Sequence, residues 1–136
     1  MAIHEGGCLC GRIRFRVTAD PLDSGYCHCR MCQRNSGAPT VAWATFPSTS
    51  FSWIAGMPTA YRSSAEATRS FCPACGSYLM FSSTEAPQEI SLNAGSFDAP
   101  EAFPPRKHIF VESRVAWFRT RDELPEHIGY GAAPGG

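Results

Sequence analysis

The cysteines constrain this chain most strongly, because all seven fall in three tight clusters separated by long stretches of sequence. The clusters are C-L-C-G at Cys8 and Cys10, C-H-C-R-M-C at Cys27, Cys29 and Cys32, and F-C-P-A-C-G at Cys72 and Cys75. An odd number of thiols cannot all pair as disulfides, and such close spacing is typical of metal ligands. Four thiolates complete a closed tetrahedral zinc site, and the other three match a zinc site with one open position.

The remaining composition indicates a single small domain with no strong attraction to charged polymers. The chain has 136 residues, with 12 basic and 12 acidic side chains. This balance leaves no net electrostatic field that would attract nucleic acid or an anionic membrane. No apolar run approaches the ~20 residues that span a bilayer. The first residues also lack a signal-peptide pattern. We therefore expect a cytoplasmic protein without nucleic-acid or membrane partners, with one zinc-binding β domain over 1–125 and a flexible tail over 126–136.

Short strands dominate the expected secondary structure, because 11 prolines and 12 glycines interrupt any long helical pattern. The clearest strand is 12–17, where Ile13, Phe15 and Val17 alternate with arginines as on a half-buried strand. Further strands are expected at 40–46, 51–54, 77–81, 89–92 and 108–118, and short helical turns at 30–36 and after Asp122. The sequence therefore predicts a mainly β protein built from small antiparallel sheets.

The first and third cysteine clusters are the best candidates for a structural zinc site. In C-P-A-C-G, the proline fixes φ after Cys72, and Gly76 permits the positive φ of a zinc knuckle. A knuckle supplies two ligands, and Cys8 and Cys10 offer a second pair directly before the clearest strand. Joining Cys8 to the middle cluster is an alternative, although it would leave other cysteines without a metal.

The middle cluster is suited to an open metal site, because Cys27, Cys29 and Cys32 can all reach one ion from a single turn. His28 is a poor fourth ligand, since side-chain alternation in an extended segment turns its ring away from the metal. A zinc ion with three thiolates is a weak Lewis acid toward water, but it holds a further thiolate in a nucleophilic form. The cluster therefore favours thiol chemistry over hydrolysis.

Arg30 and Arg34 flank the middle cluster and are candidate substrate-binding residues. Guanidinium groups match carboxylates, so both residues could engage the carboxylates of a small thiol peptide. The alternative is an exposed basic turn without a ligand, which is the usual environment of arginine. The sequence shows no catalytic triad, phosphate loop or identifiable general base.

The order of the motifs resembles the glutathione-dependent formaldehyde-activating enzyme family, which also includes centromere protein V. The resemblance spans Gly7 to about Pro125 and rests on C-x-C-G, C-H-C-x-x-C followed by R-N-S-G-A-P, R-S-F-C-P-A-C-G, N-A-G-S-F-D and K-H-I-F-V-E-S-R-V-A-W-F. It implies a β-tent fold organised around zinc. It also implies a structural zinc at Cys8, Cys10, Cys72 and Cys75 and a catalytic zinc at Cys27, Cys29 and Cys32. The chain departs from the family where two basic residues are expected after Cys32, since Gln33 precedes Arg34.

The function implied by this resemblance is that of a carbon–sulfur lyase or synthase with two zinc ions per chain. Such an enzyme adds glutathione or a similar thiol to formaldehyde and forms S-(hydroxymethyl)glutathione. The alternatives are a non-catalytic zinc module that binds small thiols or a protein partner, and an enzyme that acts on a different thiol or aldehyde. The residues alone do not separate these classes.

Overall fold

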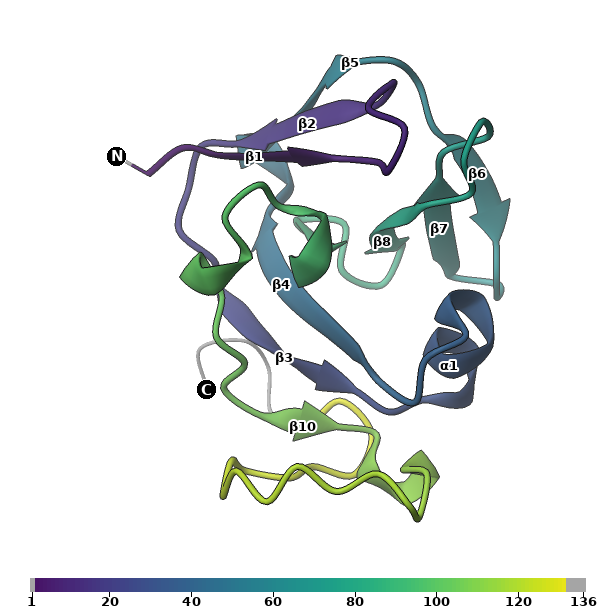
Figure 1. Cartoon of the computed structure of the whole chain (residues 1–136), viewed down its shortest axis with the longest axis vertical. Coiled ribbons are helices and arrows are strands. Elements are labelled where there is room, and N and C mark those ends of the chain that lie inside the picture. Colours follow the sequence, from purple (N-terminus) through teal and green to yellow (C-terminus); the bar gives the residue numbers. More distant parts are fainter. Residues whose placement is uncertain (1, 132–136) are drawn as a thin grey trace.

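Residues 2–131 are described by the computed structural model, in which ten strands and a few short helices alternate along the chain (Figure 1). The strands are β1 (His4–Gly7), β2 (Arg14–Val17), β3 (Asp23–Cys27), β4 (Val41–Pro47), β5 (Phe51–Ala55), β6 (Thr59–Arg62), β7 (Ala67–Phe71), β8 (Tyr78–Ser83), β9 (Glu89–Asn93) and β10 (His108–Ile109). The α-helix is α1 (Arg30–Ser36), and the 3-10 helices are η1 (Ser48–Ser50), η2 (Ala94–Ser96), η3 (Pro100–Ala102) and η4 (Val111–Ser113).

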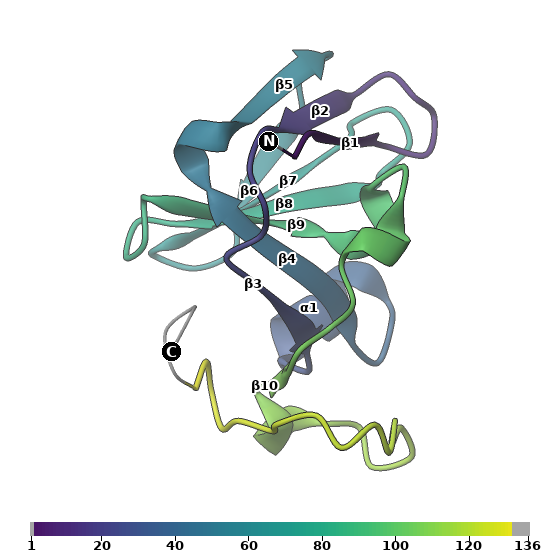
Figure 2. The same cartoon turned by 90° about the vertical axis from the view of Figure 1, so that its left-hand side faces the viewer.

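The strands form two sheets. The smaller sheet has the order β1-β2-β5, and the larger has the order β10-β3-β4-β9-β8-β7-β6. Neighbouring strands are antiparallel except β10, which pairs in parallel with β3. Figure 2 shows the smaller sheet at one end of the molecule and α1 toward the other. The mainly β class predicted from the sequence is therefore confirmed.

The core lies between the two sheets and is rich in aromatic side chains. Phe15 of β2, Phe46 of β4 and Leu92 of β9 are fully buried, and Phe15 contacts Phe97 with a ring-centroid distance of 5.1 Å. On β2, Phe15 and Val17 point inward while Arg14 and Arg16 remain partly exposed, as the alternating pattern predicts. Burial of these apolar faces holds the smaller sheet against the larger one.

Several predicted elements are confirmed with small shifts at their ends. The strands expected at 40–46, 51–54, 77–81 and 89–92 correspond to β4, β5, β8 and β9, and the helical turn expected at 30–36 is α1. The first predicted strand begins at Arg14 instead of Arg12. The reason is local, because the backbone N–H of Cys8 donates to the Ile13 carbonyl and closes a turn over these residues.

Two expectations are wrong. The strand expected over 108–118 stops after Ile109, because Phe110 adopts a left-handed conformation (φ 56°) and the chain continues into η4. The helical turn expected after Asp122 is absent from the described residues, where Arg121 and Glu123 also have positive φ values. Such residues cannot continue a right-handed helix.

The sequence patterns did not indicate β1, β3, β6 or β7, which are glycine-containing or polar. Gly25 in β3 illustrates why a weak strand former can be required. A Cβ at this position would lie 2.6 Å from the carbonyl oxygen of Lys107. Without that Cβ, the chain preceding β10 approaches closely enough for Tyr26 N–H to donate to the Lys107 carbonyl at 2.9 Å.

The end of the described chain packs beside the segment that follows β10. The N–H groups of Phe110 and Val111 donate to the carbonyls of Gly129 and His127, and the Arg114 guanidinium pairs with Glu126 at 2.9 Å. Residues 126–131, which were assigned to a flexible tail from the sequence, are therefore hydrogen-bonded to the domain. The rest of that expected tail, 132–136, lies outside the described residues.

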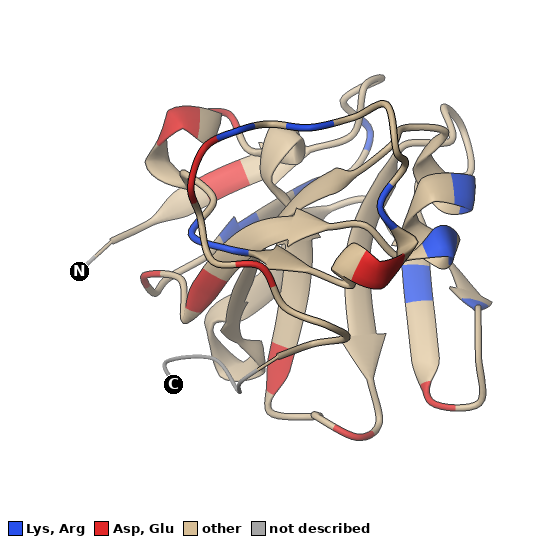
Figure 3. Ribbon diagram, turned by 90° about the horizontal axis from the view of Figure 1, so that it is seen from below, with Lys and Arg blue, Asp and Glu red and all other residues tan. Residues whose placement is uncertain are grey.

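Charged residues of both signs are interspersed along the ribbon (Figure 3). This distribution agrees with the absence of net charge in the sequence. None of the helices within residues 2–131 has the length and apolar character needed to cross a bilayer.

A buried ion pair joins β3 to the segment before β10. Lys107 Nζ lies 2.6 Å from a carboxylate oxygen of Asp23, and both side chains are largely buried. Lys107→Met would leave the Asp23 carboxylate buried without its partner, so we expect a loss of about 3–5 kcal/mol of unfolding free energy in urea titrations. Arg14→Met, which breaks the more exposed pair with Asp98, is the matched control and should lose about 1 kcal/mol or less. Equal losses in the two variants would contradict this interpretation.

Candidate metal centres

Four cysteines from opposite ends of the fold converge at the junction of the two sheets. Cys8 and Cys10 lie in the turn between β1 and β2, whereas Cys72 and Cys75 lie in the turn between β7 and β8. All four Sγ atoms lie within 4.8 Å of one another. We refer to these four residues as the four-cysteine site, and it connects the smaller sheet to the larger one.

Each of the two turns follows a knuckle geometry. Gly11 and Gly76 come directly after the second cysteine of each pair, with φ values of 81° and 79° that side chains disfavour. The Gly76 N–H donates back to the Cys72 carbonyl at 2.8 Å, and the Ile13 N–H donates to Cys8 Sγ at 3.3 Å. Each glycine thus lets its turn close tightly around the sulfurs.

The donor set of the four-cysteine site fits a zinc ion. Zinc–sulfur bonds of about 2.3 Å in a tetrahedron place the sulfurs roughly 3.8 Å apart. The Cys8–Cys10 and Cys10–Cys72 sulfur distances are 3.5 and 3.8 Å. Hydrogen bonds from the side chain and backbone of Ser77 lower the pKa of Cys75 to about 5, which favours the thiolate form that a metal requires.

The second group consists of Cys27, Cys29 and Cys32, which we call the three-cysteine site. Cys27 is the last residue of β3, Cys29 caps the N-terminus of α1, and Cys32 lies within that helix. Their Sγ atoms also lie within 4.8 Å of one another, and no fourth Cys, His, Asp or Glu from residues 2–131 joins them. This arrangement leaves room in a tetrahedral shell for one ligand from outside the chain.

The three thiols influence one another strongly. Hydrogen bonds with Cys27 and Cys32 lower the pKa of Cys29 well below its ordinary value, whereas hydrogen bonds with Cys29 and Cys32 raise the pKa of Cys27. The Cys32 backbone N–H also donates to Cys29 Sγ at 3.3 Å. These contacts favour the thiolate form at Cys29, which is the form that binds a metal.

His28 lies between two of these cysteines, and its ring stacks on that of His108, with 5.1 Å between the ring centroids. Its Nε2 lies 2.8 Å from Nδ1 of His108, and His108 Nε2–H donates to the Asp122 carboxylate at 3.0 Å. Burial lowers the pKa of His28 to about 4, so its ring is neutral near pH 7. The histidine pair fixes the end of β3 behind the three-cysteine site and supplies no metal ligand.

Arg69 is a residue of this region that the sequence patterns did not identify as functional. It comes from β7, is only 5% exposed, and donates from Nη1 to Cys32 Sγ at 3.7 Å and to the Tyr78 hydroxyl at 3.0 Å. The local sequence A-T-R-S-F offers no signal beyond one charged residue among uncharged ones. A buried cation therefore touches one sulfur of the three-cysteine site.

The arginines proposed from the sequence for substrate binding are both exposed on α1, the helix that carries Cys32. Arg30 donates to the side-chain oxygen of Gln33. Gln33 is buried and donates to the His28 and Ser113 carbonyls at 2.8 and 3.1 Å, so it joins α1 to the segment after β10. Gln33 thus connects two parts of the fold, whereas both arginines are exposed to solvent.

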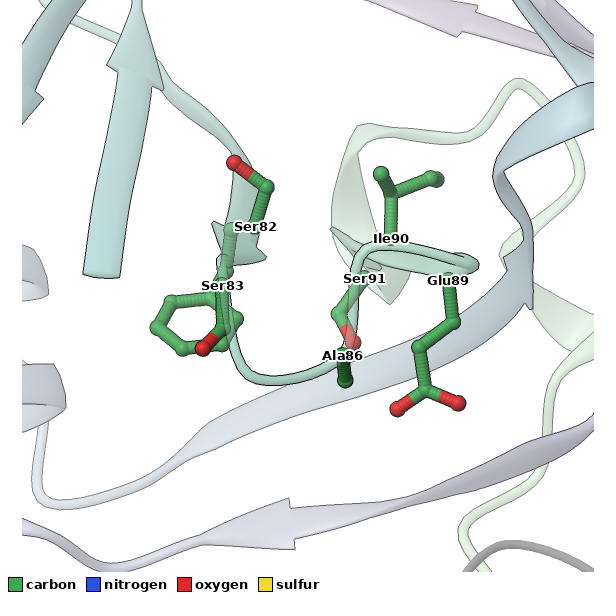
Figure 4. Close-up of a pocket in the computed structure, with 7 residues that line it drawn as sticks. Ser82, Ser83, Ala86, Glu89, Ile90 and Ser91 are labelled. Carbon is green, nitrogen blue, oxygen red and sulfur yellow. The ribbon is translucent and has the colours of Figure 1, made fainter. Parts of the chain in front are cut away.

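Two concave regions within residues 2–131 are lined without any cysteine. A cavity of about 30 Å³ beside the β8–β9 turn (Figure 4) has space for roughly one water molecule. A larger groove of about 320 Å³ is lined by His4, Phe97 and Phe103 among others, and it contains no cysteine. The converging sulfurs therefore make the two cysteine sites stronger candidates than either concave region.

Comparison with known proteins assigns the chain to a class. Residues 3–113 match the family model described as glutathione-dependent formaldehyde-activating enzyme, and this match covers most of the chain. The protein belongs to the glutathione-dependent formaldehyde-activating enzyme family. The resemblance stated from the cysteine motifs is therefore confirmed.

Individual relatives agree with this assignment. The chain is 32% identical over 103 residues to an uncharacterised lyase of Schizosaccharomyces pombe, covering 74% of this chain and 73% of the relative. It is 27% identical over 137 residues to a Halomonas elongata protein named "Putative glutathione-dependent formaldehyde-activating enzyme", covering 93% and 87% of the two chains. A crystal structure of a Rhodobacter sphaeroides protein shares the fold, with a TM-score of 0.59, 22% identity, and coverage of 90% of this chain and 98% of the other.

Proposed function

We propose that this protein is a zinc-dependent carbon–sulfur lyase or synthase that adds glutathione, or a similar small thiol, to formaldehyde. The observation that carries the proposal is the convergence of Cys27, Cys29 and Cys32 without a fourth ligand among residues 2–131. In this proposal, zinc occupies both cysteine sites, and the four-cysteine site has a structural role. The seven free thiols that this requires fit a reducing, cytoplasmic location.

The reaction needs no oxidant or reductant. The thiol gives up its proton, a sulfur lone pair forms the bond to the formaldehyde carbon, and the carbonyl π electrons move to oxygen, which then takes up a proton. Zinc, when bound, would hold the incoming sulfur as a fourth ligand and lower the pKa of the thiol. Proximity of the two reactants supplies most of the acceleration in this scheme.

The residues of the chain have separate roles in this scheme. Cys27, Cys29 and Cys32 bind the metal, and the His28–His108 pair holds β3 in place behind them. His28 is not assigned as the base, because its Nε2 is hydrogen-bonded to His108 and its Nδ1 is buried. Arg30 and Arg34 are proposed as partners for the carboxylates of the thiol peptide, and their exposure on α1 supports this role.

The test combines glutathione titration with exchange NMR. We expect glutathione to bind the zinc-loaded protein, and the exchange between formaldehyde and S-(hydroxymethyl)glutathione to be faster with protein than with buffer alone. Cys32→Ser should abolish both effects, because it removes a ligand of the open site. Binding without faster exchange would favour the non-catalytic thiol-binding module, and the absence of binding would indicate a different thiol.

A further inference from the structure

Arg69 lacks the partner that a buried cation normally has. No ion pair to its guanidinium is present among residues 2–131, although the side chain is only 5% exposed. A buried charge without compensation is strongly destabilising. The Arg69 guanidinium instead faces the three-cysteine site, with 3.7 Å between Nη1 and Cys32 Sγ.

The guanidinium is held in a fixed orientation toward these sulfurs. Its Nε donates to the Ser63 hydroxyl at 3.2 Å, and Nη1 donates to the Tyr78 hydroxyl at 3.0 Å. The Phe81 ring lies against it, with 5.1 Å between the guanidinium carbon and the ring centroid. The Tyr78 hydroxyl accepts from Arg69 and keeps its own proton, because burial raises the pKa of Tyr78.

We propose that Arg69 makes the three-cysteine site select an anionic sulfur ligand, by supplying the positive charge that balances a fourth thiolate. This inference rests on the proposed function and adds the residue that determines ligand charge. Three thiolates around a divalent ion already give a net negative charge, so a cation close by lowers the electrostatic cost of adding a further anion. Arg69 provides that cation from a second strand, whereas a neutral ligand at the same position gains nothing from it.

The role of Arg69 is electrostatic and positional, and it predicts a dependence on ligand charge. A residue that merely supports the fold would change the affinity for anionic and neutral ligands alike. A residue that balances charge would change the affinity for anions alone. The two possibilities can therefore be separated by comparing ligands of similar size that differ in charge.

The experiment uses the full chain with cobalt(II) in place of zinc, because cobalt absorption reports the fourth ligand directly. The probes are 2-mercaptoethanol, which binds as a thiolate and carries no carboxylate, and imidazole, which is neutral. For Arg69→Met we expect the Kd of 2-mercaptoethanol to rise about 10- to 100-fold, the effect of losing a charge-assisted interaction. The Kd of imidazole should change by less than about 3-fold, within ordinary mutational scatter.

Two further variants keep the test decisive if Arg69→Met does not fold. Arg69→Lys keeps the charge and should retain most of the preference for 2-mercaptoethanol over imidazole. Ser63→Ala frees the guanidinium from its hydrogen bond, and it should weaken binding of 2-mercaptoethanol several-fold while leaving imidazole binding unchanged. Parallel losses for both probes, or no loss for either, would overturn the role of Arg69.

The same measurements separate this inference from the proposed function. Binding of 2-mercaptoethanol to cobalt is read without formaldehyde, so it does not depend on catalysis. A wild-type protein that prefers the thiolate probe, loses this preference in Arg69→Met and does not accelerate formaldehyde exchange would contradict the proposed enzyme activity and support the role of Arg69. A wild-type protein that binds imidazole as tightly as it binds the thiolate probe would overturn the inference itself.

Discussion

Replacement of Cys72 by serine is expected to unfold most of the protein at physiological temperature. Cys72 is buried, and it belongs to a site whose ligands come from both sheets, so its loss releases the smaller sheet from the larger one. Structural zinc in small peptides contributes roughly 10–16 kcal/mol of apparent binding free energy, comparable to the whole stability of a domain. We expect a loss of at least several kcal/mol, measured as melting temperature together with zinc content per chain.

The matched control for this variant is Ala74→Ser in the same turn. Ala74 is exposed and lies between the two ligands, so the change adds a hydroxyl without removing a sulfur. Its effect on the unfolding free energy should be within about 0.5 kcal/mol, as for ordinary surface substitutions. If Cys72→Ser kept its zinc and melted with the wild type, the four-cysteine site would not be the structural centre of this fold.

The parts of the molecule that depend on local sequence could be predicted. The alternation of Ile13, Phe15 and Val17 identified β2, because side chains on a strand with one buried face must repeat every second residue. The three-cysteine cluster could also be recognised, since all its sulfurs come from one short segment. Both patterns are complete within a few residues, so no knowledge of the fold was needed.

The parts that depend on distant residues could not be predicted. Arg69 meets Cys32 across 37 residues of sequence, and His28 meets His108 across 80. Nothing in the neighbourhood of either residue indicates its partner. The strand β3 could not be predicted for a related reason. Glycine and aspartate are poor strand formers, but Gly25 and Asp23 make close contacts with the segment that contains Lys107. Tertiary contacts thus explain the polar strands and the charged group beside the metal ligands.

Replacement of Cys29 by serine is expected to have the opposite phenotype to the change at Cys72. Cys29 is partly exposed, and its site is confined to the end of β3 and the start of α1, so it connects no distant strands. Its sulfur also caps α1 by accepting from the Cys32 backbone N–H, and serine is among the preferred residues at this position. The fold should therefore survive, with a loss of about 1 kcal/mol or less, while the second zinc and glutathione binding are lost.

The measurement is the melting temperature beside the glutathione affinity and the zinc content of each variant. Asn35→Ser, an exposed change on the same helix, serves as control and should bind two zinc ions and glutathione like the wild type. Loss of stability in Cys72→Ser, together with loss of glutathione binding but not of stability in Cys29→Ser, would show that one cysteine set stabilises the fold and the other binds a thiol. If Cys29→Ser were as destabilising as Cys72→Ser, or bound glutathione normally, an open functional site at Cys27, Cys29 and Cys32 would be ruled out.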